Sequence, residues 1–350
     1  MSRVSYVCSV GCWLAVAVLL ISCSSPQYKP EKPWHTAGGF QNTYAKHDQG
    51  FFDYWHMRWF GDVDWKDQSQ QAHLVPQVEA DLRAIQQPDP EKRQVTWIGH
   101  STFLLQYQGL NVLTDPIFSK RASPVSFLGP SRLTPLPLSL QDLPPIDAVI
   151  ISHDHYDHLD ADTIHYLGSD VQYYVPLRLK RWFVEQGIDA DKVTQLDWWQ
   201  SAPGAMLSVH ATPSQHWSGR GLWDRFETLW ASYVIDIGDW RLWFGGDTGY
   251  NEVQFKEIGE HFGPIDLALN PVGAYLPRWF MEVAHVDPAG ATLIHKDIGA
   301  RQSVTMHWGS FQLAAEGIQR TLDDIAAARQ QAGLTEQQFQ VMAIGETQIF

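Results

Sequence analysis

The pattern of hydrophobic and polar residues from Gln94 onward predicts short strands separated by glycine turns. QVTWIG, STFLLQY and NVLTD follow one another, with Gly109 between the last two. The run DAVIIS at 147–152 shows no alternation of apolar and polar residues, and a strand of this kind is buried on both faces. Further strands are expected at 193–196, 206–212, 231–237, 241–245, 266–270 and 303–306.

Helices are predicted between the strands from apolar spacing and capping residues. HVDPAGA gives a clear helix start, with Asp287 as N-cap and Pro288 at the first helical position. Apolar residues at helical spacing predict a helix over 69–86. Two β-rich halves, each carrying helices, predict an α/β (α+β) fold of two packed sheets flanked by helices. The other helices are expected at 160–167, 176–186, 252–260, 287–298 and 312–331.

The first 50 residues differ in composition from the rest of the chain. Residues 10–21, VGCWLAVAVLLI, are apolar but too short for a comfortable bilayer span, which is typical of a signal peptide. They lead into LISC, which resembles the bacterial lipobox. The sequence therefore predicts a signal peptide over 1–22, a lipidated N-terminus at Cys23 with a tether over 23–50, and one folded domain over 51–350.

A lipid on Cys23 would anchor the chain in a bacterial envelope, and Ser24 after the cysteine favours the outer membrane, facing the periplasm. Cys8 and Cys12 lie in the segment to be removed, so the folded domain has no disulfide and no thiolate ligand. A net charge of −14 counts against nucleic acid as a partner. The aromatic segment at 51–60, FFDYWHMRWF, predicts a cap on the core or the lining of a lipid-facing groove, and the core is the favoured interpretation.

Metal-binding side chains are concentrated directly after the apolar run, in SHDHYDHLD. His153, His155, Asp157 and His158 stand in the order H-x-H-x-D-H and can converge where the strand ends. Two divalent ions need about seven or eight protein ligands and bridging groups, and the chain offers seven. The other three candidates, each at an expected strand end, are His216 in PSQHW, Asp247 in FGGDTG and His307 in MHWG.

H-x-H-x-D-H followed by separate His, Asp and His resembles the metallo-β-lactamase superfamily. This resemblance implies a four-layer αβ/βα sandwich with a binuclear metal site between its sheets. Longer blocks, in the same order along the chain, resemble the zinc phospholipases D that cleave N-acyl phosphatidylethanolamine. These blocks are TDPIFSKRASP, LPPIDAVIISHDHYDHLD, LDWW, TPSQHW, GDTGY, IGEHFGPIDLA, GAYLPRWFM, HVDP and HWG.

The resemblance implies two zinc ions held by histidine and carboxylate. Because the set contains no cysteine, harder metals are favoured, and iron or manganese stay open as alternatives. Asp157 and Asp247 would serve both as ligands and in catalysis. By the resemblance, one ion takes His153, His155 and His216, the other takes Asp157, His158 and His307, and Asp247 bridges the two.

Four more residues acquire roles by the same resemblance. Asp115 in TDP would hydrogen-bond a ligand imidazole and fix its tautomer, or would be a turn aspartate before Pro116. His285 in HVDP would lie beside the substrate phosphate as a positioning group or proton donor, or would help to cap the next helix. Tyr156 and Tyr275 would contact the phosphate or line an acyl groove, and Tyr156 could instead anchor its loop.

The implied reaction is hydrolysis of a membrane phospholipid, N-acyl phosphatidylethanolamine, to phosphatidic acid and an N-acylethanolamine. A water shared by two ions has a pKa of about 7, and the hydroxide attacks phosphorus. WIGHSTFLL at 97–105 also occurs in the broader group that includes ascorbate-6-phosphate lactonases. A lactonase or general phosphodiesterase therefore stays an alternative, and a non-enzymatic metal-binding lipoprotein is a more distant one. A homodimer is left open.

Overall fold

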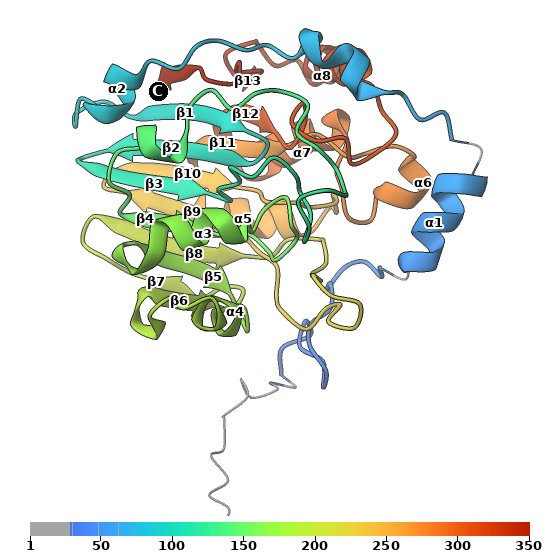
Figure 1. The fold of residues 1–350 in the computed structure, drawn as a ribbon, viewed down its shortest axis with the longest axis horizontal. Helices are drawn as coiled ribbons and strands as arrows, with labels where there is room; N and C mark the ends of the chain where they lie inside the picture. Colours follow the sequence, from blue (N-terminus) through green and yellow to red (C-terminus); the bar gives the residue numbers. More distant parts are fainter. Residues whose placement is uncertain (1–28, 30, 48, 62) are drawn as a thin grey trace, which may run out of the picture.

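The structure, a computed structural model, describes residues 29, 31–47, 49–61 and 63–350 (Figure 1). The predicted signal peptide, Cys23 and the start of the tether lie outside the described residues. Within the described ranges, no helix is long and apolar enough to cross a membrane.

Two seven-stranded sheets form the centre of the molecule. The first has the order β14-β1-β2-β3-β4-β5-β6 and the second the order β13-β12-β11-β10-β9-β8-β7. The strands of the first sheet are β1 (Gln94–Gly99), β2 (Thr102–Tyr107), β3 (Leu110–Thr114), β4 (Ala148–Ile150), β5 (Gln172–Pro176), β6 (Val193–Leu196) and β14 (Thr347–Ile349). Those of the second are β7 (Ser201–Ala202), β8 (Leu207–Thr212), β9 (Ser232–Ile237), β10 (Trp240–Phe244), β11 (Ile265–Pro271), β12 (Ala300–Met306) and β13 (Phe339–Gln340).

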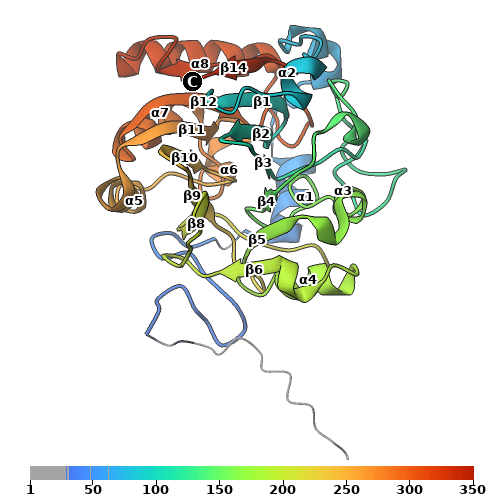
Figure 2. The same cartoon turned by 90° about the vertical axis from the view of Figure 1, so that its left-hand side faces the viewer.

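Helices cover the outer face of each sheet, as Figure 2 shows. On the first sheet lie α3 (Ala161–Leu167) and α4 (Lys180–Glu185). On the second sheet lie α5 (Gln254–Phe262) and α7 (Pro288–Asp297), and α8 (Ile318–Ala332) packs against α7. The predicted four-layer αβ/βα sandwich is confirmed. The remaining helices are α1 (Phe51–Phe60), α2 (Leu82–Gln86) and α6 (Arg278–Met281).

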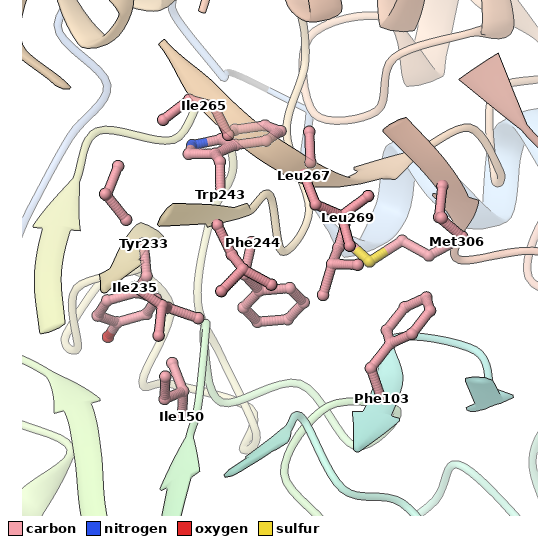
Figure 3. Close-up of a cluster of buried hydrophobic side chains, with 14 of the residues drawn as sticks. Phe103, Ile150, Tyr233, Ile235, Trp243, Phe244, Ile265, Leu267, Leu269 and Met306 are labelled. Atoms are coloured by element: carbon pink, nitrogen blue, oxygen red, sulfur yellow. The ribbon is translucent and has the colours of Figure 1, made fainter. Parts of the chain in front are cut away.

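The core between the sheets follows from the two-residue period of the strands. Phe103 of β2 and Ile150 of β4 point toward the second sheet, as Figure 3 shows. Their neighbours Leu104 and Val149 face the other way and pack under α3 and α4. Because both faces are covered, DAVIIS carries no polar alternation, and its predicted burial on both faces is confirmed.

The predicted helix over 69–86 is wrong. A 3₁₀ helix at Gln68–Leu74 is followed by extended chain and then by the short α2. Pro76 lacks an N–H and disfavours helical geometry at the residue before it. The extended chain instead pairs with the C-terminal segment, where Val78 N donates to Ile344 O at 2.9 Å. Apolar spacing alone did not reveal this partner, more than 250 residues away in the sequence.

The core interpretation of segment 51–60 is also wrong. The segment forms α1, in which only Met57 is buried among the residues whose burial is described. Phe52, Trp59 and Phe60 are exposed. Figure 1 shows α1 at the side of the sandwich, beside α6 and away from the sheet faces.

Candidate metal centre

Six strands that are each followed by a metal-binding or supporting residue direct their carboxyl ends to the same edge of the sandwich. In the first sheet β3 is parallel to β4, and β1 runs the same way because β2 is antiparallel to both β1 and β3. In the second sheet β10 is parallel to β11, which is parallel to β12, and β8 runs the same way through the antiparallel β9. The residues beyond these ends are His100 after β1, Asp115 after β3, His153 after β4, His216 after β8, Asp247 after β10 and His307 after β12.

One group of possible ligands consists of His153, His155 and His216, whose ligand atoms lie within 4.8 Å of one another. His153 Nε2 and His155 Nδ1 are 2.9 Å apart, and His216 Nε2 is 3.2 Å from the same His155 nitrogen. The outer nitrogen of His216, Nδ1, lies 2.9 Å from Ala284 O. A main-chain acceptor at Nδ1 leaves Nε2 as the nitrogen with a lone pair for a metal.

A second group contains Asp157, His158 and His307, together with His100. Asp157 Oδ2 lies 3.3 Å from His158 Nε2 and 3.4 Å from His307 Nε2. The structure thus gathers the predicted ligands of each ion into a separate cluster.

Asp247 lies between the two clusters. Its Oδ1 is 3.0 Å from His307 Nε2, and its Oδ2 is 3.3 Å from His158 Nε2. The same Oδ2 is 3.7 Å from His216 Nε2 and 3.9 Å from His153 Nε2. A carboxylate whose Oδ2 lies between the two clusters, while Oδ1 faces the second, is placed to bridge two ions.

Buried polar atoms in the clusters fit bound cations. His155 Nε2, His158 Nε2, His307 Nε2 and Asp247 Oδ1 are buried and make no hydrogen bond of acceptable geometry, although the last two atoms lie 3.0 Å apart. Buried polar groups are normally paired, and leaving one unpaired costs free energy. Imidazole nitrogens and carboxylate oxygens at this spacing are donors that zinc and similar divalent metals accept. The residues present therefore fit a two-ion centre.

Charges within the clusters balance one another in the protein alone. Burial, followed by repulsion from neighbouring histidines, holds the pKa of His153 well below its usual value, so the ring is neutral. Burial also opposes charge on His158, but the carboxylates of Asp247 and Asp157 outweigh it and raise the pKa of His158 well above its usual value. The pKa of His307 rises to about 9, again against burial, chiefly through Asp247. Because metal ligands must be deprotonated, binding of cations would release protons from this centre.

Asp115 supports the second cluster from behind. Its Oδ2 lies 2.6 Å from His158 Nδ1, and it also accepts hydrogen bonds from the N–H and hydroxyl of Ser152. Asp115 is fully buried. A carboxylate at the outer nitrogen orients the ring and directs Nε2 into the cluster, which is the arrangement expected for Asp115.

His100 is the residue in this centre that sequence reasoning missed. It is buried, and its Nε2 lies 2.9 Å from Asp157 Oδ2. Its ring centroid is 4.3 Å from that of His307, and its carbonyl accepts the His307 N–H at 3.2 Å. The motif WIGHSTFLL could have indicated His100, because His100 follows the end of β1 in the same way as the predicted ligand His307 follows the end of β12. His100 can therefore orient Asp157 or contribute a further ligand.

The backbone at the centre is held in unusual conformations. His100, Asp115 and His307 have φ of 54°, 32° and 64°. Residues other than glycine rarely adopt positive φ, and such strain concentrates at functional sites. Gly246, with φ 54°, precedes Asp247, and a Cβ there would come within 2.5 Å of Ser152 Cβ. The two sheets thus approach closely where the ligands meet.

His285 lies at the same centre. Its Nδ1 is 3.9 Å from Asp247 Oδ2, and its ring centroid is 5.0 Å from that of His216. Burial, as the largest effect, lowers the pKa of His285 well below its usual value. A neutral ring fits a positioning group better than an acid. Arg278 donates to His285 O at 2.9 Å and so fixes this segment of chain.

The hydroxyls of both predicted substrate-contacting tyrosines have partners within the protein. Tyr275 is buried, and its hydroxyl donates to Asp324 on α8 at 2.7 Å, so it braces the helix layer and its hydroxyl does not face the metal ligands. The hydroxyl of Tyr156 donates to Arg220 O at 3.0 Å, and the Arg220 guanidinium lies 4.0 Å from the ring centroid. These contacts fit Tyr156 as an anchor of its loop, and contact of either tyrosine with the substrate stays a prediction.

Comparison with known proteins gives the class of this fold and site. Residues 110–308 match the model of the beta-lactamase superfamily domain. The chain belongs to this superfamily. The crystal structure of isothiocyanate hydrolase from Delia radicum gut bacteria has a similar fold, with a TM-score of 0.60 at 21% identity over 73% of this chain and 99% of that one.

Two curated relatives carry a more specific name. The chain is 44% identical over 228 residues to N-acyl-phosphatidylethanolamine-hydrolyzing phospholipase D 1 of Caenorhabditis elegans, covering 62% of this chain and 64% of that protein. It is 38% identical over 229 residues to the mitochondrial N-acyl-phosphatidylethanolamine-hydrolyzing phospholipase D of Saccharomyces cerevisiae, covering 63% and 48%. The chain thus spans less than two thirds of each of these relatives. The predicted resemblance to this group of phospholipases is confirmed.

Proposed function

We propose that this chain hydrolyses N-acyl phosphatidylethanolamine, or a closely similar phospholipid, at the phosphodiester bond on the ethanolamide side. The observation that carries the proposal is the position of Asp247 between two histidine clusters, in which the buried Nε2 atoms of His155, His158 and His307 make no hydrogen bond. The named relatives support the choice of phospholipid among phosphodiesters.

Two divalent ions, when bound, supply a water that loses its proton near neutral pH and positive charge that offsets the charge developing on phosphate oxygens. Residues His153, His155 and His216 would hold one ion, and Asp157, His158 and His307 the other. Asp247 would hold both at a fixed separation. Zinc suits the histidine nitrogens, while iron and manganese are alternatives for the same set.

The protein's own groups orient the reactants. Asp115 and the main-chain carbonyl of Ala284 fix the ligand rings of His158 and His216. His285 lies beside Asp247 at the edge of the clusters, with 14% of its side chain exposed. An N–H at that place can bind a phosphate oxygen and hold the phosphodiester against the centre.

A product screen tests this proposal. The purified protein is incubated with N-acyl phosphatidylethanolamine, other phospholipids, a lactone panel and cyclic nucleotides, and products are identified by mass spectrometry. We expect phosphatidic acid and N-acylethanolamine, and no turnover by His155→Ala. Lactone opening without phosphatidic acid would show the lactonase alternative, and metal binding without any turnover would show the non-enzymatic one.

We also propose that Cys23 carries a lipid that anchors the protein in the bacterial envelope, facing the periplasm. The support is the LISC motif after a short apolar segment. Metabolic labelling with a fatty acid should mark the natural chain and not Cys23→Ala. Equal labelling of both chains would exclude this anchor.

A further inference from the structure

Large apolar side chains are exposed around the edge of the sandwich that holds the metal centre. They come from four separate segments, namely α1, the loop at 118–131, the loop at 217–227 and α6. Trp223 is 90% exposed and Phe127 79%. We call this set the apolar rim, and it consists of Phe52, Trp55, Trp59, Phe60, Phe127, Leu128, Leu222, Trp223 and Trp279.

The four segments lie together in two pairs, α1 with α6 and the first loop with the second. The rings of Tyr54 on α1 and Phe280 on α6 have centroids 6.4 Å apart. A cavity of about 510 Å³ is lined by Val125 of the first loop, Arg220 of the second and Tyr156 of the ligand loop. Figure 1 shows α1 and α6 on the same side of the molecule.

The rim adjoins the ligands. Trp217 begins the second loop, and its ring centroid is 4.2 Å from that of the predicted ligand His155. Asp154, from the ligand loop, accepts hydrogen bonds from Gly219 N at 2.7 Å and Thr228 Oγ1 at 2.9 Å. A surface that binds through Trp223 would therefore lie over the entrance to the metal centre.

The charge of these segments differs from that of the whole chain. In the loop at 118–131, Lys120 and Arg121 have no acidic residue beside them in the sequence. In α1 and in the loop at 217–227 basic and acidic residues cancel, and α6 contains Arg278 and no acidic residue. The whole chain carries a net charge of −14. The apolar side chains are thus exposed on segments that carry no net negative charge, which complements an anionic or zwitterionic lipid surface.

The exposed aromatic side chains indicate which partner binds the apolar rim. An exposed apolar patch of this kind marks a binding surface. Trp is enriched at the boundary between lipid and water. The predicted lipid on Cys23 lies upstream of α1 in the sequence, and Phe40, between them, is buried in the core. We infer that the apolar rim is a membrane-docking surface that inserts into the headgroup layer of a phospholipid bilayer and presents the metal centre to it. The inference rests on the proposed function only for the choice of a lipid as the partner.

Vesicle sedimentation tests the inference without catalysis. The protein tested begins at residue 23 and carries Cys23→Ala. Neither the predicted signal peptide nor a lipid can then attach it to the vesicles. The buried residues of the hydrophobic clusters in the described chain all lie between Phe40 and Ile344, so this chain keeps its core. Vesicles contain phosphatidylethanolamine with a minor share of phosphatidylglycerol and no N-acyl lipid.

We expect the chain to sediment with the vesicles, and Trp223→Ser and Phe127→Ser each to lower the partition coefficient about tenfold, because each removes one large inserted side chain. The matched control is Met206→Ser. Met206 is exposed and precedes β8, so it lies at the opposite edge of the sandwich. Far-ultraviolet circular dichroism and a thermal melt check that each variant is folded.

Three outcomes would overturn the inference. The first is that the Cys23→Ala chain without rim substitutions fails to sediment with the vesicles. The second is that Trp223→Ser has the same partition coefficient as Met206→Ser. The third outcome is a dimer in sedimentation velocity that dissociates in the rim variants, while their partitioning onto vesicles stays the same as that of the parent chain. The rim would then bind a second copy of this chain. If the product screen fails but vesicle binding depends on Trp223, the substrate proposal falls and the docking surface stands.

Discussion

The two edges of the sandwich differ in whether their polar side chains are paired within the protein. At the edge opposite the metal centre, Arg241 bonds both carboxylate oxygens of Asp236, at 2.7 and 3.0 Å. Asp266 there accepts from Arg301 at 2.8 Å. At the metal edge, the buried Nε2 atoms of His158 and His307 make no hydrogen bond. The protein itself completes the first edge, whereas the second has side chains that can bind cations.

Hydrophobic side chains show the same contrast. Few are exposed at the paired edge, whereas the metal edge exposes the whole apolar rim. Exposed apolar groups and unpaired buried polar groups each reduce stability unless a ligand completes them. Substitutions at the paired edge should therefore change mainly the stability of the fold, and substitutions at the metal edge mainly metal binding and activity.

The largest effect is expected for Asp247→Asn. The substitution removes the carboxylate charge that faces both clusters, so we expect the loss of at least one ion and a fall in turnover of at least about 10²–10³-fold. Metal analysis and the phospholipid assay measure the two effects. Asp239→Asn at the paired edge is the control, and it should retain both metals and activity. Full metal content and turnover in Asp247→Asn would contradict a bridging role.

A smaller effect is expected for Asp115→Asn. The amide keeps the shape but loses the charge that orients His158, so metal affinity should fall about 10–100-fold. Competition with a chelator, with metal release followed over time, measures this change. Release at the same chelator concentration as in the unmodified protein would show that the 2.6 Å contact has no influence on the metal.

His100→Gln should have an effect on one ion only. The substitution weakens the 2.9 Å contact to Asp157, which belongs to the second cluster, so about tenfold weaker binding of a single ion is expected. Titration of the metal-free protein, observed by calorimetry, should show one site weakened and the other unchanged. Equal weakening of both sites would mean that His100 acts through the fold and not through Asp157.

The smallest effect is expected at the paired edge. Partial burial opposes ionisation of Asp236, but hydrogen bonds from His210 and Arg241 outweigh it and lower its pKa to about 2, below the usual 3.8. A lowered folded pKa contributes stability above the unfolded value, and the contribution is lost as pH falls from about 4 to about 2. Asp236→Asn should therefore cost about 1 kcal/mol at pH 7, after allowance for solvent screening.

Urea unfolding at several pH values checks this expectation. The unmodified protein and Asp236→Asn should differ at neutral pH and converge in acid, while turnover stays unchanged. The matched control is Asp64→Asn, which removes an exposed partner of Lys66 and should change stability little. A difference that persists undiminished into acid would assign the stability to packing and not to the ion pair.

The sequence by itself determined the strands and the first part of the metal site. DAVIIS could be identified because a strand buried on both faces needs apolar residues on both. His153, His155, Asp157 and His158 could be identified because they lie within one loop, where spacing along the chain limits spacing in space. The separate ligands His216, Asp247 and His307 were found by their common place after strands, and by resemblance.

Only the tertiary structure decided which distant residues meet. His100 and Asp157 are 57 positions apart, and their contact exists because β1 and β4 end at one edge. The Tyr275 hydroxyl donates to Asp324 because α8 packs beside the segment that carries Tyr275. The local sequence around Tyr275 does not predict this packing. Segment 51–60 looked like core because its composition is apolar. Composition records what a residue can bury, whereas the packing of sheets and helices determines what remains exposed for a partner.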